Sequence, residues 1–463
     1  MTTYDVAVVG GGPAGMEAAL ATARAGLSVV LIDEHHELGG QYFHPRAASV
    51  RARLGEHRPE GRVLAGQVVA AGVEVLTGTT VWAAESSTLW VRSDPAGVHA
   101  VRAERVVVAT GATERSLPFP GWQHPSVVSG GFAQHLASSD GVAVGARVVV
   151  AGSGPFLLPV AAAITRAGGR VVALVEAGHP YGVGAAQIRS LRHPGKLVQF
   201  ARELWPLLRS GTRLVQGSVV RGVQTSGSEL QSVEISALDG NSSPFRVAAD
   251  TLVVGYGFRA QVDLLRLAGA RCVVDEHDND LTVDVDAYGR TSVPGWYAAG
   301  ETTGIAGSLA ARAEGALVAA AVVADASGRA LSAPPAAVRR ARREHAFAAL
   351  SRSLYPGAGE LARKLMDSAP DETQLCRCEG TTVGQVRAAD AGSSADVSAA
   401  KTLTRAGMGP CQGRYCAPAL CALRGTTPES LASRVPLRPV PVADLVASPL
   451  LSSGELTDTV QEA

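Results

Sequence analysis

The sequence predicts an α/β protein with two dinucleotide-binding domains and a small helical domain near its C-terminal end. Two segments in which a strand runs through a glycine-rich turn into a helix predict the nucleotide-binding domains. The third observation concerns cysteine, because five of the six cysteines lie at or beyond Cys376. Thiols in close pairs, without a disulfide framework, are typical of metal centres in a reducing compartment.

Length and composition agree with this architecture. A chain of 463 residues is long enough for about three domains of ordinary size. The 42 basic and 42 acidic residues cancel, so the net charge gives no indication of a nucleic-acid partner. Glycine, proline and arginine interrupt the longest apolar stretches well short of a membrane span. No secretory signal precedes the first strand, so we expect a cytoplasmic protein without a transmembrane segment.

The first glycine-rich turn has the G-x-G-x-x-G pattern of a dinucleotide site. Residues 5–9 form the strand before it, and residues 16–25 form the helix after it. Its glycines permit a tight turn, close approach of a pyrophosphate and tight helix packing, and they are Gly10, Gly12 and Gly15. The strand at residues 27–32 ends at Asp33, where a carboxylate accepts hydrogen bonds from a ribose. This segment therefore predicts dinucleotide binding.

Two later segments indicate which dinucleotide binds. A strand at residues 105–111 ends in Ala-Thr-Gly, and a strand at residues 296–300 leads through Glu301 to an apolar helix at residues 309–323. These segments resemble the second and third flavin signatures of the pyridine nucleotide–disulfide reductase fold, which usually has Asp at the position of Glu301. The resemblance implies an FAD-binding flavoprotein. The residues expected to hold FAD are Gly10, Gly12, Pro13, Ala14, Gly15, Asp33, Glu34, Gly40, Gln41, Thr110, Gly111, Gly300, Glu301 and Gly307.

A second strand–turn–helix segment follows at residues 147–175. Leu157 replaces the third glycine of the motif, which should hold the helix farther from the strand. An acid after the second strand favours a ribose with a free 2′-hydroxyl. The nucleotide stays open between NAD and an adenine nucleotide such as ATP, and an empty site is the alternative to both. The residues expected to hold it are Gly152, Gly154, Pro155 and Glu176.

The cysteines form the pattern C-x-C-x32-C-x4-C. The four thiolates expected to ligate a metal centre are Cys376, Cys378, Cys411 and Cys416. Two irons that each take two protein sulfurs suit this two-plus-two arrangement, which favours a [2Fe–2S] cluster. A four-cysteine zinc site is the alternative, although such sites usually space their pairs more widely than C-x-C. We expect Cys272 and Cys421 to be inert structural residues.

The flavin-binding part lacks a pair of redox cysteines, since no cysteine precedes Cys272. Thiol–disulfide exchange at the flavin is therefore excluded. His35, His36 and His44 lie near the expected flavin edge, where a proton-transfer role competes with the commoner reading of surface loop histidines. The arginines within residues 339–343 could form a docking patch, but a solvated helix face is the more common role of such a run and is the interpretation that we favour.

The order of these segments predicts the domain boundaries. We expect an FAD domain at residues 1–122 and 286–330, with a second nucleotide domain inserted at residues 123–285. A helical linker should span residues 331–370, a cluster domain residues 371–424, and an extended, proline-rich tail residues 425–463.

The cysteine segments, Cys376 to Glu379 and Thr404 to Cys416, resemble the bacterioferritin-associated-ferredoxin-like [2Fe–2S] domain. The chain as a whole resembles the FAD-containing alpha, or A-type, subunits of heteromeric bacterial amino acid and opine dehydrogenases. That family includes the corresponding subunits of opine oxidase, of hydrogen cyanide synthase and of dye-linked proline and hydroxyproline dehydrogenases. The resemblance implies that one partner is a glycine-oxidase-like flavoprotein beta subunit, joined in some members by a small ferredoxin-like gamma subunit.

Three functions are compatible with these residues. The first is an electron-transfer subunit of a dehydrogenase or oxidase for an amino acid, imino acid or opine. The second is a self-contained NAD(P)H:acceptor oxidoreductase that uses FAD and the cluster. The third, which is not enzymatic, is a docking or iron-handling role for the cysteine domain. The missing dithiol and the cluster pattern favour the first.

Overall fold

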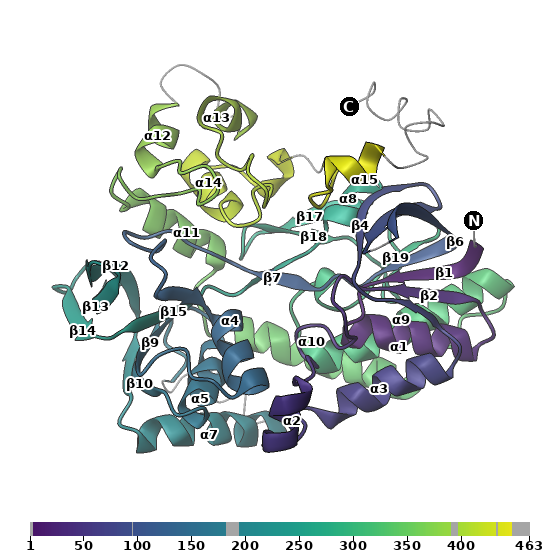
Figure 1. The fold of residues 1–463 in the computed structure, drawn as a ribbon, viewed down its shortest axis with the longest axis horizontal. Helices are drawn as coiled ribbons and strands as arrows, with labels where there is room; N and C mark the ends of the chain where they lie inside the picture. Colours follow the sequence, from purple (N-terminus) through teal and green to yellow (C-terminus); the bar gives the residue numbers. More distant parts are fainter. Residues whose placement is uncertain (1–2, 95, 182–193, 390–396, 432–433, 447–463) are drawn as a thin grey trace.

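The computed structural model describes residues 3–94, 96–181, 194–389, 397–431 and 434–446. Two parallel-sheet bodies lie side by side, and a helical unit formed by later residues sits across them (Figure 1). The first body contains both the N-terminal strands and the strand before helix α9, so the second body is inserted between them. This is the two-domain α/β fold that the glycine-rich turns predict. The domain boundaries themselves stay a prediction.

The first body is built on a seven-stranded sheet with the order β3-β2-β1-β6-β5-β4, in which β19 also pairs with β6. Its central strands are parallel, whereas β4, β5 and β6 form an antiparallel meander. The strands are β1 (Thr3–Val9), β2 (Val29–Ile32), β3 (Glu74–Leu76), β4 (Thr79–Glu85), β5 (Thr88–Ser93), β6 (Gly97–Val108) and β19 (Trp296–Ala298).

Successive side chains of β1 point to opposite faces of the sheet, so the first body has an apolar core on each face. Val6 and Val8 pack with helices α1 (Pro13–Arg24), α3 (Pro59–Ala70) and α9 (Ser308–Ser327) on one face. Ala7 and Val9 point to the other face, towards α8 (Asp263–Leu267) and the β17–β18 hairpin (Cys272–Asp275 and Asp280–Val283). Helix α2 (Ala48–Leu54) lies outside both layers, on the surface.

The second body has a five-stranded parallel sheet with the order β11-β10-β9-β15-β8. Helices cover one face, and a three-stranded antiparallel sheet covers the other. The parallel strands are β8 (Val127–Ser129), β9 (Arg147–Gly152), β10 (Arg170–Glu176), β11 (Arg213–Gln216) and β15 (Thr251–Gly255). The helices are α4 (Gly130–His135), η1 (Leu136–Asp140), α5 (Leu157–Arg166) and α7 (Pro194–Arg209), and the covering strands are β12 (Ser218–Ser226), β13 (Glu229–Ala237) and β14 (Phe245–Ala248).

Residues 213–237 divide between two sheets. Strand β11 extends the parallel sheet, whereas β12 and β13 form an antiparallel hairpin. Residues 182–193, between β10 and α7, lie outside the described residues. Two short antiparallel strands, β7 (Ala112–Glu114) and β16 (Phe258–Ala260), join the two bodies.

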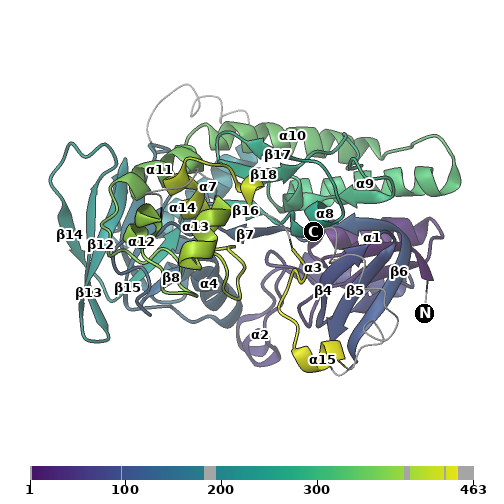
Figure 2. The same cartoon turned by 90° about the horizontal axis from the view of Figure 1, so that it is seen from above.

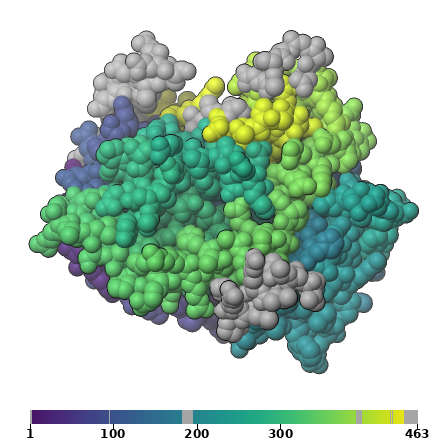
Figure 3. Space-filling view, turned by 180° about the vertical axis from the view of Figure 1, so that it is seen from behind, coloured from purple at the N-terminus to yellow at the C-terminus, as the bar shows by residue number. Residues whose placement is uncertain are grey.

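The C-terminal unit is helical, as expected. After α10 (Pro335–Arg352), which packs along α9, it contains α11 (Ala358–Asp367), α12 (Val383–Ala388), α13 (Val397–Thr404) and α14 (Ala417–Arg424). Its apolar core includes Leu361, Leu375 and Leu420 and extends to Leu117 and Val219 of the body below. Figure 2 shows the unit above the second body, and Figure 3 shows its yellow-green residues packed against the teal residues of the body.

The tail is less extended than expected. After the short helix η3 (Pro428–Ser430), residues 434–441 carry no regular helix or strand, but α15 (Val442–Val446) is a helical turn. Leu437 is buried in the core of the first body, and its N–H donates to the Trp82 carbonyl at 2.7 Å. The tail therefore ties the C-terminal unit back to the first sheet (Figure 2). Among the described residues, none of the helices is both long enough and apolar enough to cross a membrane.

Candidate functional site

The first glycine-rich turn leaves no room for side chains at Gly10 and Gly15. Gly10 has a φ of +108°, and a Cβ atom there would collide with the Ala109 carbonyl at the end of β6. A Cβ atom on Gly15 would collide with the Gly10 carbonyl. Helix α1 begins at Pro13, three residues earlier than expected, because proline is well suited to the first turn of a helix. The N-terminus of α1 thus lies directly at the turn, where its free N–H groups favour an anion.

A second loop closes on the first from the opposite side. The Gly39 N–H donates to the Gly11 carbonyl at 2.9 Å. A Cβ atom on Gly40 would lie 2.8 Å from the Gly12 Cα atom, so these two loops meet backbone to backbone. Gln41, the next residue, is exposed. Side chains at Gly12 or Gly40 would fill the space through which a pyrophosphate reaches the N–H groups of α1.

The acids after β2 have different surroundings. Asp33 is buried, and its carboxylate accepts hydrogen bonds from the backbone N–H groups of Gly11 at 2.5 Å and His35 at 2.7 Å. The His35 ring lies 3.1 Å away, and this hydrogen bond raises the pKa of His35. Glu34 instead faces Arg438 of the tail at 3.5 Å. Asp33 therefore shapes the turn itself, and a carboxylate with about four acceptor positions can still accept a ribose hydroxyl.

The ends of β6 and β19 complete the site. The Gly111 N–H donates to the Thr302 hydroxyl at 2.9 Å, which joins the second expected flavin segment to the third. The Gly300 N–H donates to Glu314 at 2.8 Å, and a Cβ atom on Gly300 would lie 2.8 Å from the Ala14 Cβ atom. Thr110, whose hydroxyl donates to the Gln261 carbonyl at 2.9 Å, borders the same region. Loops from three parts of the chain thus converge on the N-terminus of α1.

Glu301 lies at the start of this last segment, before α9. Burial raises the pKa of its carboxyl group, and a hydrogen bond from the Gly307 N–H opposes this effect. Gly307 itself is the N-cap of α9 with a φ of +87°, and no protein atom lies within 4 Å of the position that its Cβ would take. The acid and the helix N-terminus therefore border one open region, which suits a ribityl chain and a flavin ring.

Sequence reasoning missed Glu314 and Thr302, which hold the two flavin segments together. Glu314 is half-buried in α9, where it also accepts a hydrogen bond from Thr303 and contacts His345 at 2.7 Å. The contact with Glu314 raises the pKa of His345. The signal was available, because a lone glutamate within the apolar part of the helix at residues 309–323 calls for a buried polar partner. A pocket of about 460 Å³ opens beside this pair, between α9 and α10.

The second glycine-rich turn differs from the first. A Cβ atom on Gly152 would collide with the Gly255 carbonyl, whereas nothing lies within 4 Å of the corresponding position on Gly154. Helix α5 begins only at Leu157, three residues after Gly154, and the Leu157 side chain packs over Gly255. The helix N-terminus is thus farther from the turn than in the first body, in agreement with the missing third glycine. Pro155 follows the turn and is exposed.

Glu176 is completely buried at the end of β10. Its carboxylate accepts hydrogen bonds from the N–H groups of Gly154 at 3.1 Å and Gly178 at 3.0 Å. Burial raises the pKa of Glu176 to about 7, although these donors oppose the effect. Burial raises the pKa of the Tyr181 and Tyr355 phenols, and the nearby Glu176 charge adds to the effect.

The chain after α10 covers this end of the second sheet. A Cβ atom on Gly178 would lie 3.0 Å from the Leu354 carbonyl and 3.0 Å from the Pro356 ring. Residues 354–356 therefore pack directly on the turn that follows Glu176. An adenosine ribose could reach Glu176 only if this segment moved.

The four cysteines of the C-terminal unit pair across the two motifs. Cys416 lies beside Cys376 in the buried part of the unit, and Cys378 lies beside Cys411 nearer the surface. The neighbouring Cys416, followed by the backbone N–H groups of Gly407, Glu379 and Cys378, lowers the pKa of the Cys376 thiol to about 5. A Cβ atom on Gly409 would collide with Cys378, so this glycine permits the close approach.

The four cysteine sulfurs equal in number the protein ligands of a [2Fe–2S] cluster, and a four-cysteine zinc site needs the same number. Among the residues that the structure describes, no three or more His, Cys, Asp or Glu side chains form a single metal-binding group. Two separate cysteine pairs are what two irons require, since each iron takes two protein sulfurs. N–H groups aimed at a sulfur are also characteristic of such clusters. Cys272 and Cys421 lie outside both pairs, and burial raises the pKa of each thiol.

Other predicted residues lie apart from both sites. The rings of His44 and His135 stack edge to face at 4.3 Å, and burial lowers the pKa of His44. His36 packs beside Gly78. The four arginines of α10 are exposed, in agreement with a solvated face, and they are Arg339, Arg340, Arg342 and Arg343.

The fold and these turns define a family. The family model described as pyridine nucleotide-disulphide oxidoreductase matches residues 4–324. The chain therefore belongs to this family of flavin-dependent oxidoreductases. A similar fold occurs in thioredoxin reductase from T. acidophilum, which covers 71% of this chain and 100% of its own, with a TM-score of 0.54 and 20% identity.

Curated relatives extend the similarity to the C-terminal unit. The A-type subunit of opine oxidase from Rhizobium meliloti is 31% identical over 96% of this chain and 100% of its own length. Hydrogen cyanide synthase subunit HcnB from Pseudomonas aeruginosa is 32% identical over 94% of this chain and 96% of its own. The solved structure of L-proline dehydrogenase from P. horikoshii covers 96% of this chain and 79% of its own, with a TM-score of 0.66 and 22% identity. The opine oxidase and hydrogen cyanide synthase relatives are named as subunits of larger enzymes.

A side chain at Gly12 should prevent FAD binding. In Gly12→Val the isopropyl group would occupy the gap opposite Gly40 and hold a pyrophosphate away from α1. We expect the purified variant to be colourless, with FAD content near zero by absorbance after denaturation. Gly66→Val, at a helix position with open space around it, is the control and should keep full FAD. A yellow Gly12→Val protein with full FAD would contradict this assignment.

Serine at any of Cys376, Cys378, Cys411 or Cys416 should remove the cluster and leave FAD bound. Each substitution would remove one of the four proposed protein ligands of a two-iron cluster. Iron analysis and visible circular dichroism measure the loss. Cys421→Ser and Cys272→Ser are matched controls and should retain the wild-type iron content. Zinc instead of iron in the wild-type protein, or equal loss in Cys421→Ser, would contradict the ligand set.

Proposed function

We propose that this chain is the FAD- and [2Fe–2S]-containing electron-transfer subunit of a heteromeric dehydrogenase or oxidase. Its donor substrate would be an amino acid, an imino acid or an opine. The observation that carries the proposal is the packing of two cysteine pairs onto a flavoprotein body that has no cysteine before Cys272. A flavoprotein without a dithiol needs another route for its electrons, and a cluster provides one.

The chain's own residues would bind and orient the cofactor. The N–H groups at the start of α1 and the backbone of Gly12 and Gly40 would hold the pyrophosphate, and Asp33 a ribose. Glu301 and the N-terminus of α9 would lie along the ribityl chain and the ring. Bound FAD supplies the ability to take up two electrons and to release them singly. N–H donors around Cys376 would stabilise negative charge on the cluster sulfurs, which favours its reduction.

The proposed partners are those that the family resemblance implies. A glycine-oxidase-like flavoprotein beta subunit would oxidise the amine, and a small ferredoxin-like gamma subunit is a second proposed partner. The assembly would work in the cytoplasm. The opine oxidase relative and HcnB are both subunits by name, which supports this arrangement.

The second nucleotide fold bears on the alternative, a self-contained NAD(P)H:acceptor oxidoreductase. Glu176 is buried near Tyr181 and residues 354–356, so the acid that should bind an NAD ribose is covered. This observation favours the electron-transfer subunit. Gly154, between Gly152 and Pro155, still leaves open space at the turn, where ATP or NAD stays a proposal for a nucleotide without a redox role.

The proposal predicts that amine oxidation depends on a partner. The chain expressed alone should not reduce a dye with proline, glycine or an opine, whereas the chain purified with its native partners should. Dye reduction under anaerobic conditions with a panel of amino acids and opines measures both. Turnover of an amino acid by the single chain would contradict the proposal. Full flavin reduction by NADH within a catalytic turnover would favour the alternative instead.

A further inference from the structure

Each of the two cysteine motifs contains an arginine between its ligating positions, and both arginines reach out of the C-terminal unit. Arg377 lies between Cys376 and Cys378, and Arg414 lies between Cys411 and Cys416. The partners of Arg377 are on the flavoprotein body. Arg414 has partners on the body and on the tail, in addition to Cys411 and Gln412 of its own loop. A movement of either arginine would therefore move a loop that carries proposed cluster ligands.

Arg377 connects the first cysteine motif to the flavoprotein body through Trp122. Its guanidinium group lies 4.6 Å from the ring centroid of Trp122 and donates to the Trp122 carbonyl at 3.3 Å. The Trp122 indole N–H in turn donates to the Gln374 carbonyl at 2.5 Å. Trp122 is buried in the core of the second body, so this contact is rigidly supported.

Arg414 ties the second motif to a different part of the body. Its guanidinium donates to Asp263 of α8 at 2.7 and 3.1 Å and to the Leu437 carbonyl of the tail at 2.8 Å. The Arg414 carbonyl accepts a hydrogen bond from Arg259 at 3.0 Å. Leu437 is buried in the core of the first body, so the loop is held between α8, β16 and the tail.

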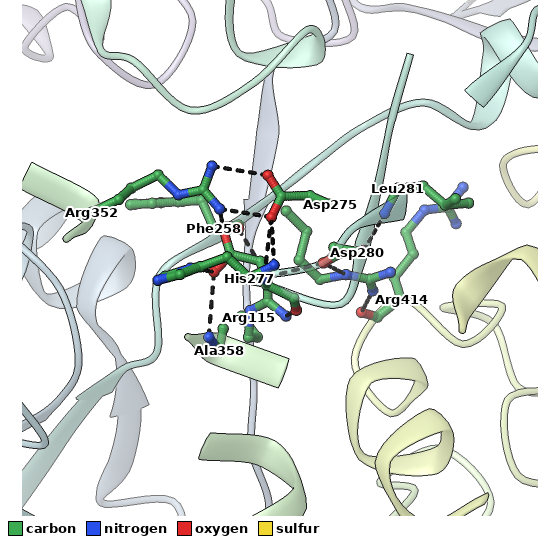
Figure 4. A network of polar contacts seen from close by, with 11 residues as sticks. Arg115, Phe258, Asp275, His277, Asp280, Leu281, Arg352, Ala358 and Arg414 are labelled. Atoms are coloured by element: carbon green, nitrogen blue, oxygen red, sulfur yellow. Dashed lines mark hydrogen bonds and ion pairs between the residues drawn. The ribbon is translucent and has the colours of Figure 1, made fainter. Parts of the chain in front are cut away.

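Arg259 belongs to a buried group of charged side chains that also includes Asp280 and Arg115. Asp280 lies 2.6 Å from Arg259 and 3.0 Å from Arg115, and all three side chains are largely buried. Arg115 and Asp280 lie between the Arg414 loop and the ion pair that Asp275 forms with Arg352 of α10 (Figure 4). Removal of one member of such a group leaves a buried charge without its partner, so the network holds Arg259 in one position.

We infer that Arg377 and Arg414 are positioning residues that fix the cluster against the flavoprotein body for electron transfer. Two anchor points on different parts of the body, one on Trp122 and one on Asp263, prevent the unit from tilting about either. The inference rests on the proposed function, because it assumes that FAD and the cluster exchange electrons within this chain. The rate of electron transfer falls as the distance between flavin and cluster grows, so a unit that tilts away from the body should transfer electrons more slowly.

The test measures electron transfer after flash reduction of the bound flavin, in Arg377→Gln, in Asp263→Asn and in the double variant. Arg414 itself is left unchanged, because it also donates to the Cys411 carbonyl at 3.3 Å within the cysteine loop. Asp263→Asn removes the ion pair with Arg414 without changing a residue of that loop. We expect unchanged iron and FAD contents in every variant. Reduction of the cluster should be several-fold slower in each single variant and slower still in the double variant.

Arg405→Gln is the matched control. Arg405 lies in the same cysteine segment but pairs with Glu379 inside the unit at 2.7 Å and is largely exposed. It should transfer electrons at the wild-type rate. Wild-type rates in the double variant with full iron, or an equal loss in Arg405→Gln, would overturn the inference. Failure of the proposed function would look different, since the wild-type protein itself would then contain no iron cluster or show no transfer to it.

Discussion

Backbone atoms approach one another without intervening side chains around the N-terminus of α1, and the rest of the structure depends on this contact. Gly10 meets the end of β6, Gly40 meets Gly12, and Gly300 meets Ala14. Gly315 of α9 packs on the Ala14 carbonyl, which brings the two helices close together. Any side chain at these positions would separate elements that lie far apart in the sequence. The same contact keeps the N–H groups of α1 accessible to an anion.

The C-terminal unit holds its proposed ligands in a different way from the FAD site. These cysteines lie on loops, which are positioned by side-chain contacts rather than by close backbone packing. Loops hold a position only when other groups fix them. Here the fixing groups belong to the body: Trp122, Arg259 and Asp263 contact the two cysteine loops, and Leu437 returns the tail to the first sheet. The unit is therefore joined to the flavoprotein by hydrogen bonds at its metal-binding end in addition to its apolar core. This arrangement suits a path for electrons between the two.

Local features of the sequence were sufficient for the strands, the glycine-rich turns and the helical nature of the C-terminal unit. Each depends on residues a few positions apart, such as the steric demands of Gly10 and Gly15. The pairing of Cys376 with Cys416 was not predictable, because sequence spacing groups each cysteine with its nearest neighbour whereas the fold pairs one from each motif. Thr302 and the cover over Glu176 depend on contacts between distant segments, which composition and periodicity do not encode.

The central claim is that electrons pass from a flavin to an iron–sulfur cluster within this chain. Electron paramagnetic resonance of the complex, purified with its native partners and reduced anaerobically by its amine substrate, tests it most directly. The account predicts the signal of a reduced [2Fe–2S] centre, with a spin count close to the content of bound FAD, and its loss in Cys411→Ser. A protein whose flavin is fully reduced by substrate while no iron signal develops would contradict the account.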